Sequence, residues 1–244
     1  NAIQGYLSEI YDQNQRLTEQ RKRTLIAHYD AMEAQLNPHF LYNTLSVIGM
    51  TGLASGNMDV SNMCTELSQL LRYSLSYTGQ SVILSQEIDN ARHYLYIMKI
   101  RYEDDLEYEW QLDESLNSIT VPKLILQPLV ENALYHGLLH CNAGSSIYLS
   151  ARKENKIIYF TVKDDGVGMA SETLEQLQKL LEEKPKFGEL SQHANESIGL
   201  KNINARIRLY YGEDYGLSVK SEQGCGTTVQ IKIPELAEET KEEA

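Results

Sequence analysis

Apolar residues recur every three or four positions through the first part of the chain, a spacing that predicts helices with one buried face. From Tyr6 to Leu36 the chain contains no proline and keeps a coiled-coil spacing, so residues 1–36 are expected to form a coiled-coil helix. Pro38 interrupts this helix because its ring removes a backbone donor and crowds the preceding turn. We expect a new helix to start there, with Asn37 as its cap and Pro38 at its first position.

Two amphipathic helices follow Pro38 and are joined by a turn. The first carries Leu41 and Leu45 on one face, the glycine-containing turn covers 52–59, and the second helix covers 60–74. Two such helices form an antiparallel hairpin. A lone hairpin cannot bury both of its apolar faces, so pairing with a second copy into a four-helix bundle is expected.

A third helix and then a change of period follow the hairpin. The helix is predicted over 85–103, with Ser85 as its cap and Glu87 near its positive end. From residue 106 onward apolar residues alternate in short runs, which predicts strands, and helical stretches separate these runs. Strands interleaved with helices after an all-helical part indicate the α+β class. The expected strands cover 108–112, 147–151, 158–162, 217–221 and 227–233, and the expected helices cover 123–138, 171–183 and 201–211.

Composition and charge narrow the function classes. The chain is 42% hydrophobic and 23% charged, which is ordinary for a soluble globular protein. Its net charge of −12 opposes the approach of a nucleic-acid backbone, so no nucleic-acid partner is expected. The 3 cysteines are far apart, which argues against both a disulfide framework and a zinc site. No apolar run reaches the roughly 20 residues that a membrane helix needs.

The segment around His39 combines three residue types that suit phosphoryl transfer. Pro38 loosens the backbone next to the histidine, and Asn43 lies one helical turn later on the same face. A neutral imidazole is abundant near neutral pH and is a competent phosphoryl acceptor. A histidine on a helix is by itself more often a packed or surface residue, so its neighbours carry this interpretation.

A second segment, residues 126–137, places polar side chains within an apolar stripe. Leu129 and Ala133 belong to a face suited to a core, yet Glu131 and Asn132 lie between such positions and need polar partners if they are buried. The neutral amide oxygen of Asn suits a magnesium ion that is already held by triphosphate oxygens.

Three glycine-containing segments follow. Residues 164–168 read Asp-Asp-Gly-Val-Gly directly after an apolar strand, which by itself is also typical of a simple turn. Residues 197–202 open a helix, where backbone amides attract phosphate oxygens. Residues 224–228 precede the last strand. By themselves they are as typical of a hairpin turn as of a functional segment.

Taken in order, these segments resemble LytS/YesM-type sensor histidine kinases over residues 35–234. The Pro-His-Phe-Leu run with an asparagine four residues after the histidine resembles their phosphoacceptor box, and the later segments resemble the nucleotide-binding boxes of the GHKL superfamily. The resemblance implies an α/β sandwich of the Bergerat (GHKL) type after the helical hairpin. The implied domains are a signalling coiled coil (1–36), a dimerisation and histidine phosphotransfer domain (37–105), a catalytic ATP-binding domain (106–234) and a disordered acidic tail (235–244).

The resemblance also implies roles for individual residues. His39 is the phosphorylated residue, Asn43 positions water during dephosphorylation, and Asn132 binds magnesium. Asp164 accepts a hydrogen bond from the adenine amino group of ATP. The remaining implied nucleotide contacts are His136 and the Gly199 and Leu200 amides at phosphate, Gly166 and Gly168 in close backbone approach, the mobile ATP lid over 170–196, and Thr227 in support of Asp164.

The implied activity is ATP-dependent autophosphorylation of His39, with Mg²⁺, followed by transfer to an aspartate of a response regulator receiver domain. The implied form is a homodimer, and the implied location is the cytoplasmic portion of a bacterial inner-membrane protein whose membrane segments lie outside this chain. We further expect a shift at the Pro38 kink to change the access of His39 to nucleotide.

Three positions depart from related families. Phe40 stands where many histidine kinases have an acidic residue that assists the histidine, and Glu131 is one candidate for that task. Ser197 stands where a glycine is usual. Pro128 stands where GHKL ATPases place a water-activating glutamate, which argues against ATP hydrolysis. The alternatives are a GHKL-fold ATPase and a dimeric scaffold that binds nucleotide without autokinase activity.

Overall fold

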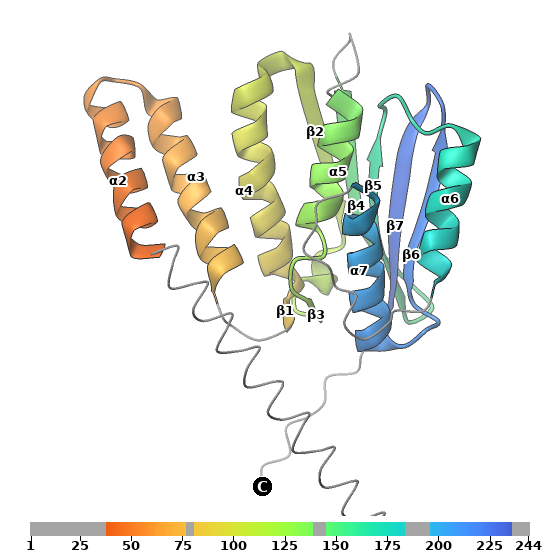
Figure 1. Ribbon diagram of the computed structural model, residues 1–244. Coiled ribbons are helices and arrows are strands. Elements are labelled where there is room, and N and C mark those ends of the chain that lie inside the picture. Colours follow the sequence, from red (N-terminus) through yellow and green to blue (C-terminus); the bar gives the residue numbers. More distant parts are fainter. Residues whose placement is uncertain (1–37, 77–80, 139–144, 184–195, 236–244) are drawn as a thin grey trace, which may run out of the picture. The chain divides into compact units, whose positions relative to one another are not determined.

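The computed structural model describes residues 38–76, 81–138, 145–183 and 196–235 (Figure 1). The chain divides into two compact units, with the boundary between Leu75 and Ser76. The predicted coiled coil over 1–36 and the cap at Asn37 lie outside the described residues, as does most of the predicted tail. Within the described ranges, no helix combines the length and the apolar character that crossing a bilayer requires.

The first unit contains the predicted helical hairpin, formed by α2 (Pro38–Ala54) and α3 (Met58–Leu75). Helix α2 begins at Pro38, as predicted, because the first turn of a helix does not need the missing backbone donor. The two helices approach closely at glycines of α2. A Cβ atom at Gly52 would lie 2.9 Å from Cγ1 of Val60, and one at Gly49 would lie 3.2 Å from Cβ of Cys64.

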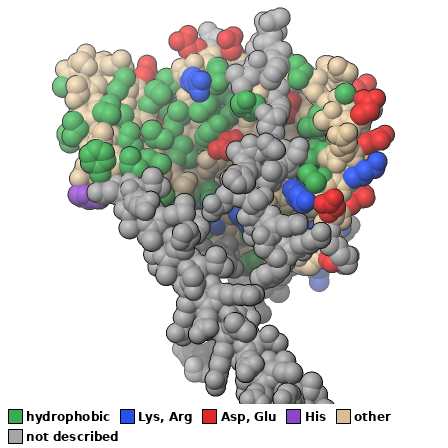
Figure 2. Space-filling view, in the orientation of Figure 1, with side chains coloured by type: hydrophobic (Ala, Val, Ile, Leu, Met, Phe, Trp, Pro, Cys, Tyr) green, Lys and Arg blue, Asp and Glu red, His purple; other side chains and the backbone are tan. Residues whose placement is uncertain are grey.

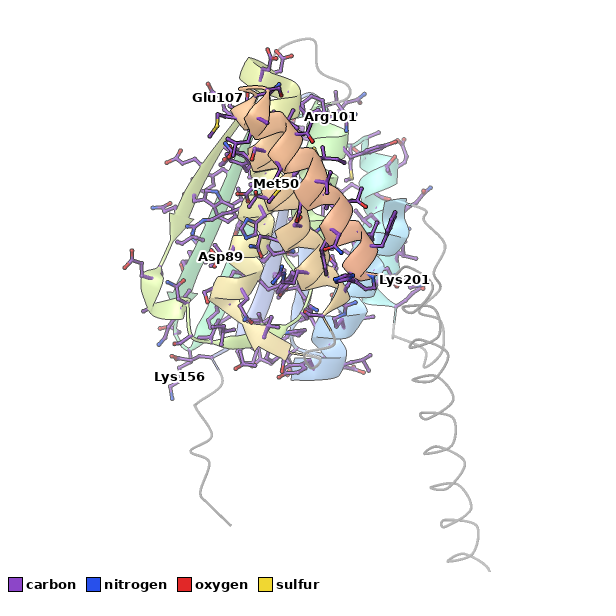
Figure 3. The ribbon with its side chains drawn as sticks, turned by 90° about the vertical axis from the view of Figure 1, so that its left-hand side faces the viewer. Met50, Asp89, Arg101, Glu107, Lys156 and Lys201 are labelled. Atoms are coloured by element: carbon purple, nitrogen blue, oxygen red, sulfur yellow. The ribbon has the colours of Figure 1, made fainter. Side chains whose placement is uncertain are left out.

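Because glycines make the contact with α3, several large apolar side chains of α2 lie at the surface. Figure 2 shows hydrophobic side chains exposed over this hairpin. Met50, labelled in Figure 3, is 71% exposed. The other strongly exposed apolar residues of α2 are Phe40, Val47 and Leu53.

The second unit is built on a five-stranded sheet in the order β2-β4-β5-β7-β6. Strands β2 and β4 pair in parallel, and the other neighbours are antiparallel. In β5 the residues Ile158, Phe160 and Val162 are buried and alternate with more exposed ones, as the sequence predicted. The strands are β2 (Leu106–Leu112), β4 (Ser145–Glu154), β5 (Ile157–Asp164), β6 (Gly216–Glu222) and β7 (Gly226–Pro234), and each contains one predicted strand.

The sheet is packed by helices α5 (Gln127–Leu138), α6 (Ser171–Glu182) and α7 (Glu196–Tyr211), among others. Helix α5 begins four residues later than predicted, because Leu124 has a left-handed backbone with φ of 59° and the chain turns there. Helix α7 begins earlier than predicted, at residue 196, so Gly199 and Leu200 lie inside its first turns rather than before it. A helical layer on one face of a mixed sheet, after a helical hairpin, confirms the predicted α+β class.

Helix α4 (Leu84–Tyr102) confirms the third predicted helix, but the predicted cap at Ser85 is wrong. The N-cap residue is Ile83, which makes no side-chain cap. The first amides of the helix are satisfied by the backbone instead, since Leu84 N donates to Ile119 O at 2.8 Å and Ser85 N donates to Asn117 O at 3.1 Å. The sequence analysis missed two short strands at this end, β1 (Ser81–Ile83) and β3 (Thr120–Pro122), which pair antiparallel, and two 3₁₀ turns, η1 (Glu103–Asp105) and η2 (Glu114–Leu116).

The packing of α4 groups it with the sheet rather than with the hairpin. Leu84 and Leu95 are completely buried, and Lys99 Nζ donates to Leu106 O at 2.6 Å. Residue 76 therefore marks the division by packing, whereas the sequence placed a domain boundary at 105/106. The domain ranges 37–105 and 106–234 stay predictions.

Glu235 is the first residue of the predicted acidic tail, whose bounds stay a prediction. Glu235 continues the contacts of β7, because its backbone N–H donates to Lys156 O at 2.8 Å and its carboxylate pairs with Lys153. Residues 236–244 lie outside the described part of the chain.

Candidate functional site

A cavity of about 520 Å³ lies in the second unit, between the sheet and its helices. Its walls come from α5, the segment after β5, α6, the start of α7 and β7. The lining residues include Asn132, Asp164, Gly168, Leu200 and Thr227, which the sequence predicted as nucleotide ligands, together with Leu129, Met169, Thr173, Leu177 and Leu180.

Asp164 is the buried carboxylate of this cavity, with 5% of its surface exposed. Its Oδ1 atom accepts hydrogen bonds from the backbone N–H of Gly166 at 3.0 Å and of Thr227 at 3.1 Å. These two donors hold the carboxylate at the end of β5 in a fixed orientation. The carboxylate is therefore placed to accept a hydrogen bond from a ligand in the cavity.

Two glycines allow the turn between β6 and β7 to pack on the segment that follows β5. A Cβ atom at Gly168 would lie 1.9 Å from Glu222 O, and one at Gly226 would lie 2.1 Å from Asp164 O. Both glycines have positive φ, at 62° and 83°. Glycine is thus required at 168 because the backbone of Glu222 packs against it. The predicted close approach of Gly168 to nucleotide stays a prediction.

Thr227, which the sequence predicted to support Asp164, donates its backbone N–H to that carboxylate. The Thr227 hydroxyl lies 2.9 Å from Ser221 Oγ. Ser221 also accepts a hydrogen bond from Met169 N and donates to Gly226 O, both at 2.9 Å. The sequence analysis missed Ser221, which stands in β6 among strand residues without any motif of its own.

Asn132 presents an unsatisfied polar atom at the cavity. Its Nδ2 atom is buried and has no hydrogen-bond partner among the described residues. A buried amide without a partner costs free energy unless a ligand or water completes it. The described residues contain no cluster of three or more His, Cys, Asp and Glu side chains suited to a metal. The orphan Nδ2 atom is a donor and suits a phosphate oxygen, whereas a magnesium ion would take the Oδ1 atom of the same amide and its other ligands from phosphate and water.

Glu131 lies on α5 next to Asn132 but belongs to a different set of contacts. It accepts a hydrogen bond from Gln127 Nε2 at 2.7 Å, and Gln127 Oε1 accepts one from Asn90 Nδ2 of α4 at 2.6 Å. The burial of Tyr94 and the nearby negative charge of Glu131 raise the pKa of Tyr94 to about 12. Glu131 is therefore engaged toward α4, and its predicted assistance to His39 stays a prediction.

The predicted phosphate-binding residues Gly199 and Leu200 lie near the start of α7, where Gly199 is the fourth residue. The amides that lack a carbonyl partner within a helix are those of the N-cap and the first three residues, so the phosphate-binding role of the Gly199 and Leu200 amides stays a prediction. Leu200 lines the cavity and is 5% exposed. The side chains of His136 and Ser197, and residues 184–195 of the predicted lid, lie outside the described part of the structure; the lid's first half is helix α6.

His39 and Asn43 lie in the first unit, on the first turns of α2. Asn43 Nδ2 is 3.2 Å from Nδ1 and 3.3 Å from Nε2 of His39, and both residues are exposed. The predicted sharing of one helix face is confirmed. An exposed imidazole with a neighbouring amide is accessible to a ligand carried by another part of the protein.

Two family models match this chain. The model described as "Histidine kinase" matches residues 27–106. The model described as "Histidine kinase-, DNA gyrase B-, and HSP90-like ATPase" matches residues 118–237.

Curated relatives agree with these matches. The "Sensor histidine kinase YesM" of Bacillus subtilis is 36% identical over 204 residues, covering 84% of this chain and 33% of the relative. The "Sensor protein kinase HptS" of Staphylococcus aureus is 29% identical over 238 residues, covering 95% of this chain and 44% of the relative. The chain thus spans less than half the length of these relatives.

Among solved structures, the histidine kinase domain of the blue-light activated histidine kinase of Erythrobacter litoralis EL346 is similar. It has a TM-score of 0.46 and 15% identity, and the match covers 81% of this chain and 93% of that chain.

Proposed function

Because this chain belongs to the family of sensor histidine kinases, we propose that it transfers the γ-phosphoryl group of ATP to its own His39. The phosphohistidine then donates this group to an aspartate in the receiver domain of a response regulator. ATP is available in the cytoplasm, so the proposal places the chain on the cytoplasmic side of a bacterial inner membrane.

One observation carries the proposal: residues from four separate sequence motifs converge on a single cavity. Asn132, Asp164, Leu200 and Thr227 are far apart in the sequence, yet all line the same space of about 520 Å³. A space of that size suits a small-molecule ligand. The buried Asp164 carboxylate at one wall and the unsatisfied Asn132 amide at another match the adenine amino group and the phosphate end of ATP.

In the proposed reaction one nitrogen–phosphorus bond forms and one phosphorus–oxygen bond breaks. The unprotonated ring nitrogen of His39 attacks the γ-phosphorus, the bond from that phosphorus to the bridging oxygen breaks, and ADP leaves. The proton on the other ring nitrogen passes to solvent water. Phosphoryl transfer depends mainly on positioning and electrostatics. In this chain Asp164 orients the base, the free amides of the first turn of α7 face phosphate oxygen, and Asn43 lies beside the imidazole, where it positions water during dephosphorylation.

We propose Asn132 as the magnesium ligand. The ion, when bound, balances negative charge on the β- and γ-phosphates. The single amide oxygen is sufficient because Mg²⁺ usually keeps several waters and shares phosphate oxygens.

The test is a phosphorylation assay on the whole chain with γ-labelled ATP and Mg²⁺. We expect protein-bound label that is stable in base and labile in acid, as for a phosphohistidine, and no label from α-labelled ATP. Added response regulator should then remove the label from the chain and acquire it.

Two outcomes of this assay would contradict the proposal. Steady release of phosphate without protein-bound label would indicate an ATPase of the same fold, although Pro128 stands where the water-activating glutamate of such enzymes is expected. Nucleotide binding without label or release would indicate a nucleotide-binding scaffold.

We also propose that the chain works as a homodimer through its helical hairpin. The supporting observation is the exposure of Phe40, Val47 and Met50, at 63%, 64% and 71%. Phe40 and Val47 are seven residues apart on α2 and therefore share a face. Covering this face with a second hairpin would remove these side chains from water.

Replacing Val47 with glutamate is expected to dissociate the dimer. Two unpaired carboxylates would be buried in a symmetric interface, at a cost of several kcal/mol, or at least about a 100-fold rise in Kd. Sedimentation equilibrium of the whole chain measures this change. The Gln86→Glu variant adds the same charge at an exposed position of α4 and should remain dimeric. A Val47→Glu chain that stays as dimeric as the parent would place the interface elsewhere.

A further inference from the structure

Glu87 is a completely buried carboxylate with no role in the reaction described above. It lies on α4, and its two oxygens accept three backbone hydrogen bonds from another part of the chain. Oε1 accepts from Leu124 N at 2.6 Å, and Oε2 accepts from Ile125 N at 2.8 Å and from Leu126 N at 2.9 Å. The sequence predicted only that Glu87 favours the positive end of its own helix.

The three amides belong to the turn that leads into α5, and this turn is also held from its other side. Arg206 of α7 donates through Nη1 to Lys123 O at 2.6 Å and to Leu124 O at 3.3 Å. Leu124 has a φ of 59°, which leucine rarely adopts, so the turn persists because these contacts hold it. The amides are thus bound by α4 and the carbonyls by α7.

The turn determines where α5 begins. Leu126 O accepts the first amide hydrogen bonds of the helix, from Leu129 N at 3.1 Å and Val130 N at 3.2 Å. The amide of Leu126 is in turn bound by Glu87. Asn132 follows on the same helix less than two turns later, where it lines the cavity. A shift of the turn would therefore move the amide of Asn132 relative to the cavity.

We propose that Glu87 is a positioning residue for the nucleotide site, which fixes the start of α5 and so holds Asn132 toward the phosphates and their magnesium ion. This inference rests on the proposed function. The proposal distinguishes the two ends of the ligand. Asp164, at the adenine end, lies on β5 and is held by the amides of Gly166 and Thr227, whereas the position of Asn132 depends on the turn.

The variant Glu87→Gln tests the proposal with little change in shape. A carboxylate has two acceptor oxygens, but the amide of glutamine has one acceptor and one donor. Whichever way the amide turns, its NH₂ group faces at least one backbone N–H of the turn, and that contact is repulsive. Asp89→Asn is the matched control, because Asp89 is exposed on the same helix (labelled in Figure 3) and pairs only with Arg92 among the contacts described for it.

The measurement is the Kd of a non-hydrolysable ATP analogue for the whole chain, with and without Mg²⁺. In the parent and in Asp89→Asn we expect Mg²⁺ to tighten binding. In Glu87→Gln we expect binding without Mg²⁺ to be unchanged, while the gain from Mg²⁺ falls by about 10- to 100-fold, as for residues that orient a metal ligand. A purely structural role would weaken binding equally under both conditions.

Arg206→Met provides a second variant, since Arg206 is exposed and its loss does not threaten the core. We expect the same selective loss of the gain in affinity from Mg²⁺, to a smaller extent. If circular dichroism shows that Glu87→Gln does not fold, the Arg206→Met variant tests the proposal instead. Equal weakening with and without Mg²⁺, or no change in either, would overturn the inference alone. A parent chain that binds no nucleotide would overturn the proposed function and this inference with it.

Discussion

Replacing His39 with glutamine is expected to abolish the phosphoryl label while leaving nucleotide binding unchanged. A glutamine amide keeps the polarity and much of the length of histidine but has no nucleophilic ring nitrogen. His39 lies on α2 of the first unit, whereas every residue that lines the cavity belongs to the second unit. The assay compares protein-bound label from γ-labelled ATP with the Kd of a non-hydrolysable analogue in the same preparation.

His93→Gln is the matched control for this experiment, because His93 lies on α4 of the second unit and belongs to no predicted site. It should label as the parent does. Retention of acid-labile label by His39→Gln would show that another histidine accepts the phosphoryl group. Loss of nucleotide binding together with the label would show that the substitution acts on the fold rather than on the nucleophile.

Replacing Asp164 with asparagine is expected to weaken ATP binding strongly. Asn can still accept from Gly166 N and Thr227 N through one oxygen, but it presents an NH₂ group where the second carboxylate oxygen was. That group would face the amino group of adenine, donor against donor. The loss of a hydrogen bond to a charged acceptor costs about 1.5–3 kcal/mol, or roughly a 10- to 150-fold rise in Kd.

Titration calorimetry with ATP and GTP measures this effect, and Asp165→Asn is the control. Asp165 is the next residue and carries the same charge, but it is exposed and its Oδ1 accepts from Ser146 N outside the cavity. Its replacement should change the ATP affinity little. If Asp164→Asn bound ATP as tightly as the parent, the adenine would have to be recognised by other residues.

The periodicity of the sequence was sufficient to predict most of the elements. The alternation of Ile158, Phe160 and Val162 predicts β5, and it also places Asp164, two residues further on, on the buried side of the same strand. The break at Pro38 predicts the start of α2. These predictions succeed because the spacing of side chains on a helix or strand is a local property of the backbone.

Local spacing was less informative where a backbone group finds its partner far along the chain. The start of α4 was misplaced at Ser85, because the carbonyls that satisfy its first amides come from residues 117 and 119. The start of α5 was misplaced because Glu87 and Arg206 hold the turn at Leu124. No residue close in sequence to these helix starts indicates either contact.

The residue types of the proposed nucleotide site could be recognised from the sequence, but their assembly could not. Motifs identified Asn132, Asp164 and Thr227 one by one. That they line one cavity follows from the order of the sheet, in which β7 lies beside β5, and from the packing of α5 across these strands. Strand order and helix packing depend on contacts between distant segments, which no local pattern of hydrophobic and polar residues encodes. The same reason explains why the buried role of Glu87 became visible only in the folded chain.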